Sequence, residues 1–158
     1  DSEGRLIWCH EAASLYSRLE ADDFMTHIVA AVDRLRADAA TVPSDDEIAL
    51  YGKMRHEYLR KLKAEPFINR YSLALTIGAR SFGIPIPVLQ APRDQMQPRL
   101  TEDRQRLMAF SRVVSVGMPK ALNTWMGIAR AFHRHHPCVY NATHKYGAQI
   151  AAAMEMSQ

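Results

Sequence analysis

Apolar residues recur at intervals of three and four along most of the chain, and prolines fall between the periodic segments. This spacing is typical of amphipathic α-helices, because residues three and four positions apart share one helix face. The pattern predicts helices over residues 3–20, 22–41, 44–64, 66–83, 101–117, 119–136 and 141–157. No segment requires a strand. We therefore expect an all-α fold in which residues 1–158 form a single-domain bundle of five to seven helices.

Two of the predicted helices have clear local signals at their ends. Ser44 followed by Glu47 has the spacing of a capping box, and Pro43 ends the preceding segment. Pro66 suits the first position of the next helix, and Gly83 suits the position just beyond its end. The segment 66–83 is the least polar of the predicted helices, so we expect it to be the central one.

Residues 84–98 interrupt the helical pattern with Pro85, Pro87, Pro92 and Pro98. They predict an extended crossover between four N-terminal helices (1–82) and three C-terminal helices (99–158). Four apolar residues lie within it, namely Ile84, Ile86, Val88 and Leu89. Two interpretations follow: this segment is a strap lying across the bundle, or its apolar residues are exposed and dock a partner.

Charge is unevenly distributed along the chain. Residues 1–50 contain 11 acidic and 4 basic side chains, a net charge of −7. Residues 51–158 contain 6 acidic and 16 basic side chains, a net charge of +10. Such polarity favours docking on a charged partner or head-to-tail stacking of copies.

Basic residues recur at spacings of three and four on several predicted helices. If their faces converge, they form a groove for a phosphate backbone, although few aromatic residues are placed for base stacking. The alternative is that these basic side chains only lie on solvent-exposed helix faces and bind no partner. The candidate nucleic-acid-binding residues are Lys53, His56, Arg60, Lys63, Arg104, Arg112, Lys120, Arg130 and Arg134.

A cluster of potential metal ligands lies near the C-terminus. It comprises His133, His135, His136, Cys138 and His144. The spacing argues against a metal site, because Pro137 is expected to end the helix and no Cys-x-x-Cys pair is present. We interpret the cluster as the cation-rich end of a helix. Cys9 and Cys138 do not form a secreted disulfide framework, although one bridge between the terminal helices stays open.

Motifs that carry catalysis are absent from the sequence. There is no Gly-x-Ser-x-Gly, no Gly-rich phosphate loop and no apolar run of about 18 residues. We expect no catalytic residue, metal, cofactor or small-molecule substrate, and an intracellular location, cytoplasmic or organellar after presequence removal. The sequence favours a non-enzymatic helical subunit or adaptor that docks other protein subunits. The alternative is a small helical subunit of a ribonucleoprotein or RNA-guided complex that contacts the phosphate backbone.

Overall fold

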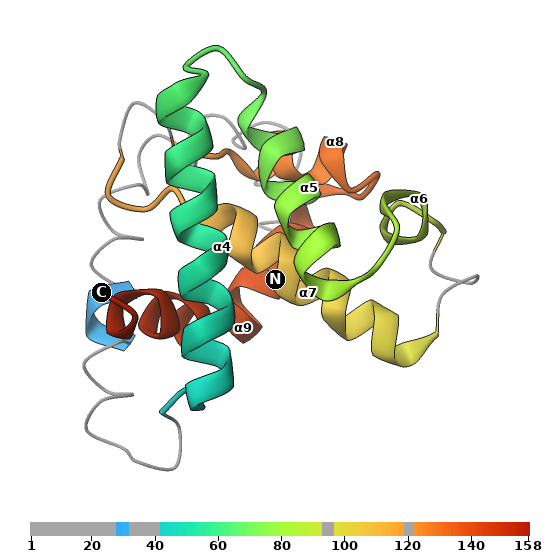
Figure 1. Ribbon diagram of the computed structural model, residues 1–158. Helices are drawn as coiled ribbons and strands as arrows, with labels where there is room; N and C mark the ends of the chain where they lie inside the picture. Colours follow the sequence, from blue (N-terminus) through green and yellow to red (C-terminus); the bar gives the residue numbers. More distant parts are fainter. Residues whose placement is uncertain (1–27, 32–41, 93–96, 119–121) are drawn as a thin grey trace.

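The computed structural model describes residues 28–31, 42–92, 97–118 and 122–158, and every regular element within these ranges is a helix. The predictions for residues 1–27 and 32–41 lie outside them. The named helices are α4 (Asp45–Ala64), α5 (Arg70–Phe82), α6 (Ile86–Leu89), α7 (Pro98–Val113), α8 (Trp125–Ala131) and α9 (His136–Met156), arranged as in Figure 1. One core cluster receives residues from all six, which confirms the all-α, single-domain bundle.

Helix α4 begins as its sequence predicts. The Glu47 amide donates to the Ser44 hydroxyl at 3.2 Å, and the Ser44 amide donates to a Glu47 carboxylate oxygen at 3.2 Å. This reciprocal pair is a capping box, which satisfies two amides that the first turn leaves without helical partners. Tyr51, Met54 and Tyr58 face the core and are buried.

Helix α5 begins at Arg70, four residues later than Pro66. The Asn69 side-chain oxygen accepts hydrogen bonds from the Tyr71 and Ser72 amides, both at 3.0 Å, so Asn69 rather than proline sets the start. The predicted end is confirmed, because Gly83 caps the helix with φ +67°, a left-handed conformation that glycine adopts without strain. At Gly78, a Cβ would lie 2.7 Å from Leu107, so α5 approaches α7 closely.

The predicted extended crossover contains a helical turn, α6, and α7 already begins at its last residue, Pro98. Regular structure was not expected here because of the prolines. Pro87 lies in the first turn of α6, however, where its missing amide hydrogen removes no helical bond. Ile84 and Leu89 are buried in the core. The segment therefore covers the bundle, in agreement with the strap interpretation.

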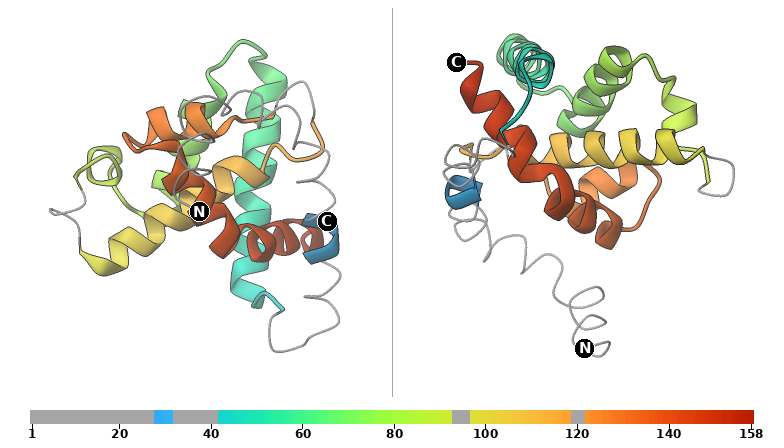
Figure 2. Two further views of the ribbon diagram at one scale, coloured as in Figure 1. Left: turned by 180° about the vertical axis from the view of Figure 1, so that it is seen from behind. Right: turned by 90° about the horizontal axis from the view of Figure 1, so that it is seen from below.

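Helix α7, rather than α5, is the enclosed element of the bundle. All residues from Leu107 to Ser115 are buried, which requires neighbours on every side. Its main contacts are with α5, α8 and α9, and Figure 2 shows α5 and the first half of α9 on opposite sides of it. Small residues of α9, including Gly147 and Ala151–153, permit the close packing of α7 and α9.

The boundary between the last two helices differs from the prediction. Helix α8 begins at Trp125, after the Thr124 cap, and ends at Ala131. His133 then adopts a left-handed conformation with φ 54° in the turn that follows. Pro137 lies in the first turn of α9 and so helps to start a helix instead of ending one. None of the described helices is both long and apolar enough to cross a membrane.

Candidate docking surface

The outer face of α4 carries the basic stripe that the sequence predicts. Because Tyr51, Met54 and Tyr58 turn toward the core, positions on the opposite side face solvent. The structure leaves Lys53, His56, Arg60 and Lys63 exposed on that side. We call these four residues the α4 ridge. Of the nine predicted nucleic-acid-binding residues, these four are brought together on one surface.

Charge along α4 runs from acidic to basic. Asp45, Asp46 and Glu47 occupy the first turn, whereas Lys61 and Lys63 occupy the last, an order that the helix dipole favours. Neighbouring charges are paired: Lys61 contacts Glu65 at 2.8 Å, and Arg80 of α5 forms an ion pair with Glu57. Among the described residues, no carboxylate forms an ion pair with a member of the α4 ridge.

Phe67 lies just beyond the end of α4 and is also exposed. It lies in the turn before α5, and its side chain is fully exposed, while the neighbouring Ile68 packs against the core. The helix predicted over residues 66–83 would include Phe67, and that start is wrong because α5 begins only at Arg70. No sequence signal distinguishes Phe67 from Ile68, since only the conformation of the turn decides which of them faces inward.

Arg104 and Arg112 are not on the surface, contrary to the prediction. Arg104 is 4% exposed and donates to the Ala91 carbonyl at 3.2 Å, a contact that holds the strap to α7. Arg112 is fully buried and donates to the Asn123 carbonyl. The guanidinium of Arg112 also lies 4.0 Å from the centre of the Trp125 ring, where the aromatic face attracts a cation.

A polar network adjoins Arg112 and involves its backbone carbonyl. The Ser115 hydroxyl donates to the Arg112 carbonyl at 3.1 Å and accepts from the Asn123 amide at 2.9 Å. The Asn123 side chain donates to the Ser111 carbonyl at 2.8 Å. These bonds join the end of α7 to the segment before α8, so Arg112 serves the interior of the protein rather than a nucleic-acid surface.

The remaining predicted cations are distributed elsewhere. Arg130 is exposed on α8, whereas Arg134 is half-buried and donates to the Ala91 carbonyl, as Arg104 does. Lys120 lies outside the described residues. The main contacts of α4 are with α5 and α9, and those of α8 are with α5, α7 and α9. Arg130 therefore belongs to a helix that shares no main packing interface with the ridge.

The histidine cluster spans the turn between α8 and α9: His133 follows the C-cap of α8, whereas His136, Cys138 and His144 belong to α9. The interpretation as cations at a helix C-terminus therefore fits His133 alone. His135 is the residue before α9, and His133 lies in the preceding turn. The His144 ring lies 4.3 Å from that of Tyr140, and Cys138 carries an exposed free thiol. In the described part of the chain, no three His, Cys, Asp or Glu side chains are grouped to hold a metal ion.

Comparison of the chain with protein-family models, with curated proteins and with solved structures finds no match.

Proposed function

We propose that this protein is a non-enzymatic helical subunit or adaptor that docks an acidic protein surface through the α4 ridge and Phe67. The observation that carries the proposal is a helix face with four exposed basic or titratable side chains, followed in the next turn of the chain by a fully exposed Phe67. Aromatic anchors dominate the energy of protein interfaces, whereas a charged rim steers the partner and selects it.

Phe67 supports docking because its exposure brings no benefit to the isolated fold. Burial of a phenylalanine side chain stabilises by about 2–3 kcal/mol, and the core cluster of this protein gains nothing from Phe67. A partner with an apolar pocket would recover that energy. The basic ridge beside it favours a pocket that is rimmed by Asp and Glu.

A phosphate backbone is a weaker candidate for the partner. Proteins that track single strands combine a basic groove with several aromatic platforms. Here the ridge occupies one convex helix, and Phe67 follows in the next turn of the chain. Arg104 and Arg112 are buried and form their contacts inside the protein. Binding of nucleic acid is therefore the alternative outcome of the test below.

The test compares four proteins: the native sequence, the ridge variant Lys53→Glu/Arg60→Glu/Lys63→Glu, Phe67→Ala, and the control Arg130→Glu. The control alters an exposed cation on another helix. Partners are recovered from native extract, purified, and titrated against each variant by calorimetry. We expect the ridge variant and Phe67→Ala each to weaken binding by about 10-fold or more, with the control unchanged. Equal loss in the control, or full retention in the ridge variant, would contradict the proposal.

The nucleic-acid alternative is measured in parallel by fluorescence anisotropy of labelled single-stranded RNA and DNA, at about 50 and 200 mM salt. Tight binding that weakens steeply with salt and is lost in the ridge variant would replace the acidic protein with a phosphate backbone as the partner. Absence of binding at the lower salt concentration would remove this alternative.

A further inference from the structure

A second candidate site lies on the inner side of α4, away from the ridge. Residues of α4, α7 and α9, with Phe82 from the end of α5, line a cavity of about 400 Å³ that is open to solvent on one side. Sites for small organic ligands commonly have volumes of about 300–1,000 Å³. The lining residues are Glu47, Leu50, Tyr51, Phe82, Asp103, Arg106, Tyr146, Gln149 and Ile150. The cavity is therefore large enough for a small organic molecule.

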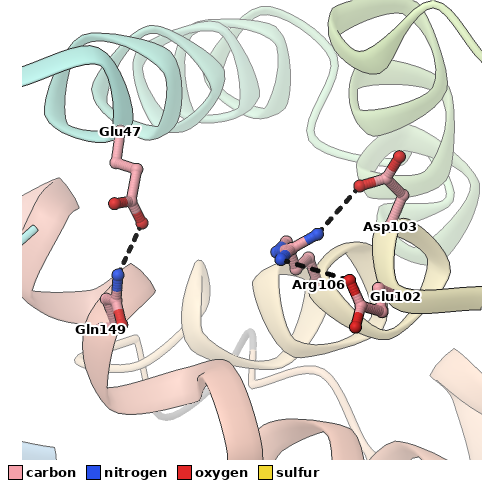
Figure 3. A network of polar contacts seen from close by, with 5 residues as sticks. All are labelled: Glu47, Glu102, Asp103, Arg106 and Gln149. Atoms are coloured by element: carbon pink, nitrogen blue, oxygen red, sulfur yellow. Dashed lines mark hydrogen bonds and ion pairs between the residues drawn. The ribbon is translucent and has the colours of Figure 1, made fainter. Parts of the chain in front are cut away.

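The polar groups of the cavity lie on two opposite sides, as Figure 3 shows. On one side, the Gln149 amide donates to a Glu47 carboxylate oxygen at 2.8 Å. On the other, Arg106 contacts Asp103 at 3.0 Å and Glu102 at 3.8 Å, both on its own helix. Two lining carboxylates against one guanidinium leave the cavity with a net negative charge. Because Arg106 already faces two carboxylates, it is poorly placed to bind an anion.

Tyr51 brings a hydroxyl to this cavity. Only 3% of the residue is exposed, and its ring packs against Phe82 and Phe110, with 6.3 Å between centroids in each case. Glu47, Asp103 and Arg106 are close enough to influence its ionisation, which places the hydroxyl among the polar lining groups. A polar group of a ligand in the cavity can therefore contact this hydroxyl.

The apolar lining adds aromatic faces to these charges. Tyr51, Phe82 and Tyr146 contribute rings, while Leu50 and Ile150 contribute aliphatic surface. The Tyr146 ring already attracts cations, since the Arg106 guanidinium lies 5.0 Å and the Lys145 ammonium 5.1 Å from its centroid. Aromatic faces and carboxylates both favour positive charge, and the aliphatic surface favours an apolar body.

We propose that this cavity binds a small organic cation, with an ammonium or guanidinium head and a short apolar body. The head lies on the Asp103 side of the cavity and donates a hydrogen bond to the Tyr51 hydroxyl oxygen. The body packs against Phe82, Leu50 and Ile150. Sequence reasoning missed this site because its lining comes from four helices far apart in the chain, and no local motif joins them.

The test uses the full chain, labelled with ¹⁵N, and three probes: 2-phenylethylamine, agmatine and putrescine. Two analogues of the first probe keep its body and change its head, the anion 3-phenylpropionate and the neutral 2-phenylethanol. We expect at least one amine to bind with a Kd of about 1 mM or lower and to shift the amide signals of Tyr51, Tyr146 and Gln149. No binding by any of the amines, or equal binding of the anion, would overturn the proposal.

Variants then assign the head group to its partners. Asp103→Asn and Tyr51→Phe should each weaken amine binding by about 5- to 10-fold, since each removes one contact to the head. Asp46→Asn is the matched control: it removes an exposed carboxylate from the first turn of α4, outside the cavity lining. Equal weakening in the control, or unchanged binding in Asp103→Asn, would show that general charge and not this site attracts the amine.

Discussion

Basic residues on α4 and α7 have opposite fates in this protein, although both sets are spaced as helical stripes. On α4, Lys53, Arg60 and Lys63 reach solvent, while on α7 Arg104 and Arg112 are buried. The difference follows from how many neighbours each helix has. Helix α4 is covered on one side, whereas α7 is enclosed from Leu107 onward and meets the strap at Arg104. An arginine on an enclosed helix must then find its hydrogen bonds inside the protein.

The two sets of basic residues are expected to have different roles: the α7 arginines stabilise the fold, and the α4 cations bind a partner. The α7 arginines hold the strap and the segment before α8, so their loss should act on the free energy of unfolding. The α4 cations form no internal ion pair within the described residues, so their loss should act on binding. Substitutions in the two sets can therefore test whether the α7 arginines stabilise the fold and the α4 cations do not.

The largest effect is expected for Arg112→Ala. This change removes a buried charged hydrogen bond to Asn123 and the contact with the Trp125 ring, and it leaves a cavity in the core. The free energy of unfolding should fall by about 3–5 kcal/mol. Urea denaturation followed by circular dichroism measures this change. A loss no larger than that of Lys53→Ala would end the distinction between the two helices.

A smaller effect is expected where two arginines share one acceptor. Arg104 and Arg134 both donate to the Ala91 carbonyl. Each single change to Ala should lower the free energy of unfolding by about 1–2 kcal/mol. The double variant should lose more than the sum of the single losses if one donor can satisfy the carbonyl alone, and denaturation of all four proteins tests this. Strict additivity would show that the two bonds act independently.

Substitutions on the inner and outer faces of α4 should differ in their effect on the pH dependence of stability. Burial raises the pKa of Tyr51 from 10.0 to about 12, so the folded protein holds this proton more tightly than the unfolded chain. The resulting stability is fully present below pH 10 and is lost as pH rises from 10 to about 12. Tyr51→Phe should make the decline in stability over this range shallower. Lys53→Ala, an outer-face change, is the control and should leave the pH dependence of the native protein intact.

The smallest effect on stability is expected for the α4 ridge. The variant Lys53→Ala/Arg60→Ala/Lys63→Ala should change the free energy of unfolding by less than about 1 kcal/mol, because exposed cations without partners contribute little. Thermal and urea denaturation provide the measurement. A loss of several kcal/mol would mean that the ridge stabilises the fold, which would contradict a role of its cations in binding alone.

Local signals predicted the fold best where they were complete. The Ser44–Glu47 pair and Gly83 fixed the start of α4 and the end of α5, since each acts through its nearest neighbours. Pro137 was misread because proline is compatible both with the residues after a helix and with its first turn. Tertiary packing decides whether such a proline follows one helix or starts the next, and residue spacing alone does not show this.

The candidate surfaces were only partly predictable for the same reason. The α4 ridge follows from period and composition, since one side of α4 is clearly apolar. The burial of Arg112 was not predicted from the helical spacing of the basic residues, because that spacing does not show which helix is enclosed. One signal was present: the segment from Leu107 to Val116 is apolar on every side of a helix, apart from Ser111, Arg112 and Ser115. A polar residue inside such a segment is more often an interior hydrogen-bonding group than a surface one.

The two arginines that share the Ala91 carbonyl differ in their distance from it along the chain. Arg104 is 13 residues from Ala91, and Arg134 is 43 residues from it. The shorter loop closes at a lower entropic cost. The contact from Arg104 therefore demands less chain entropy than the contact from Arg134, although both donors meet the same carbonyl oxygen.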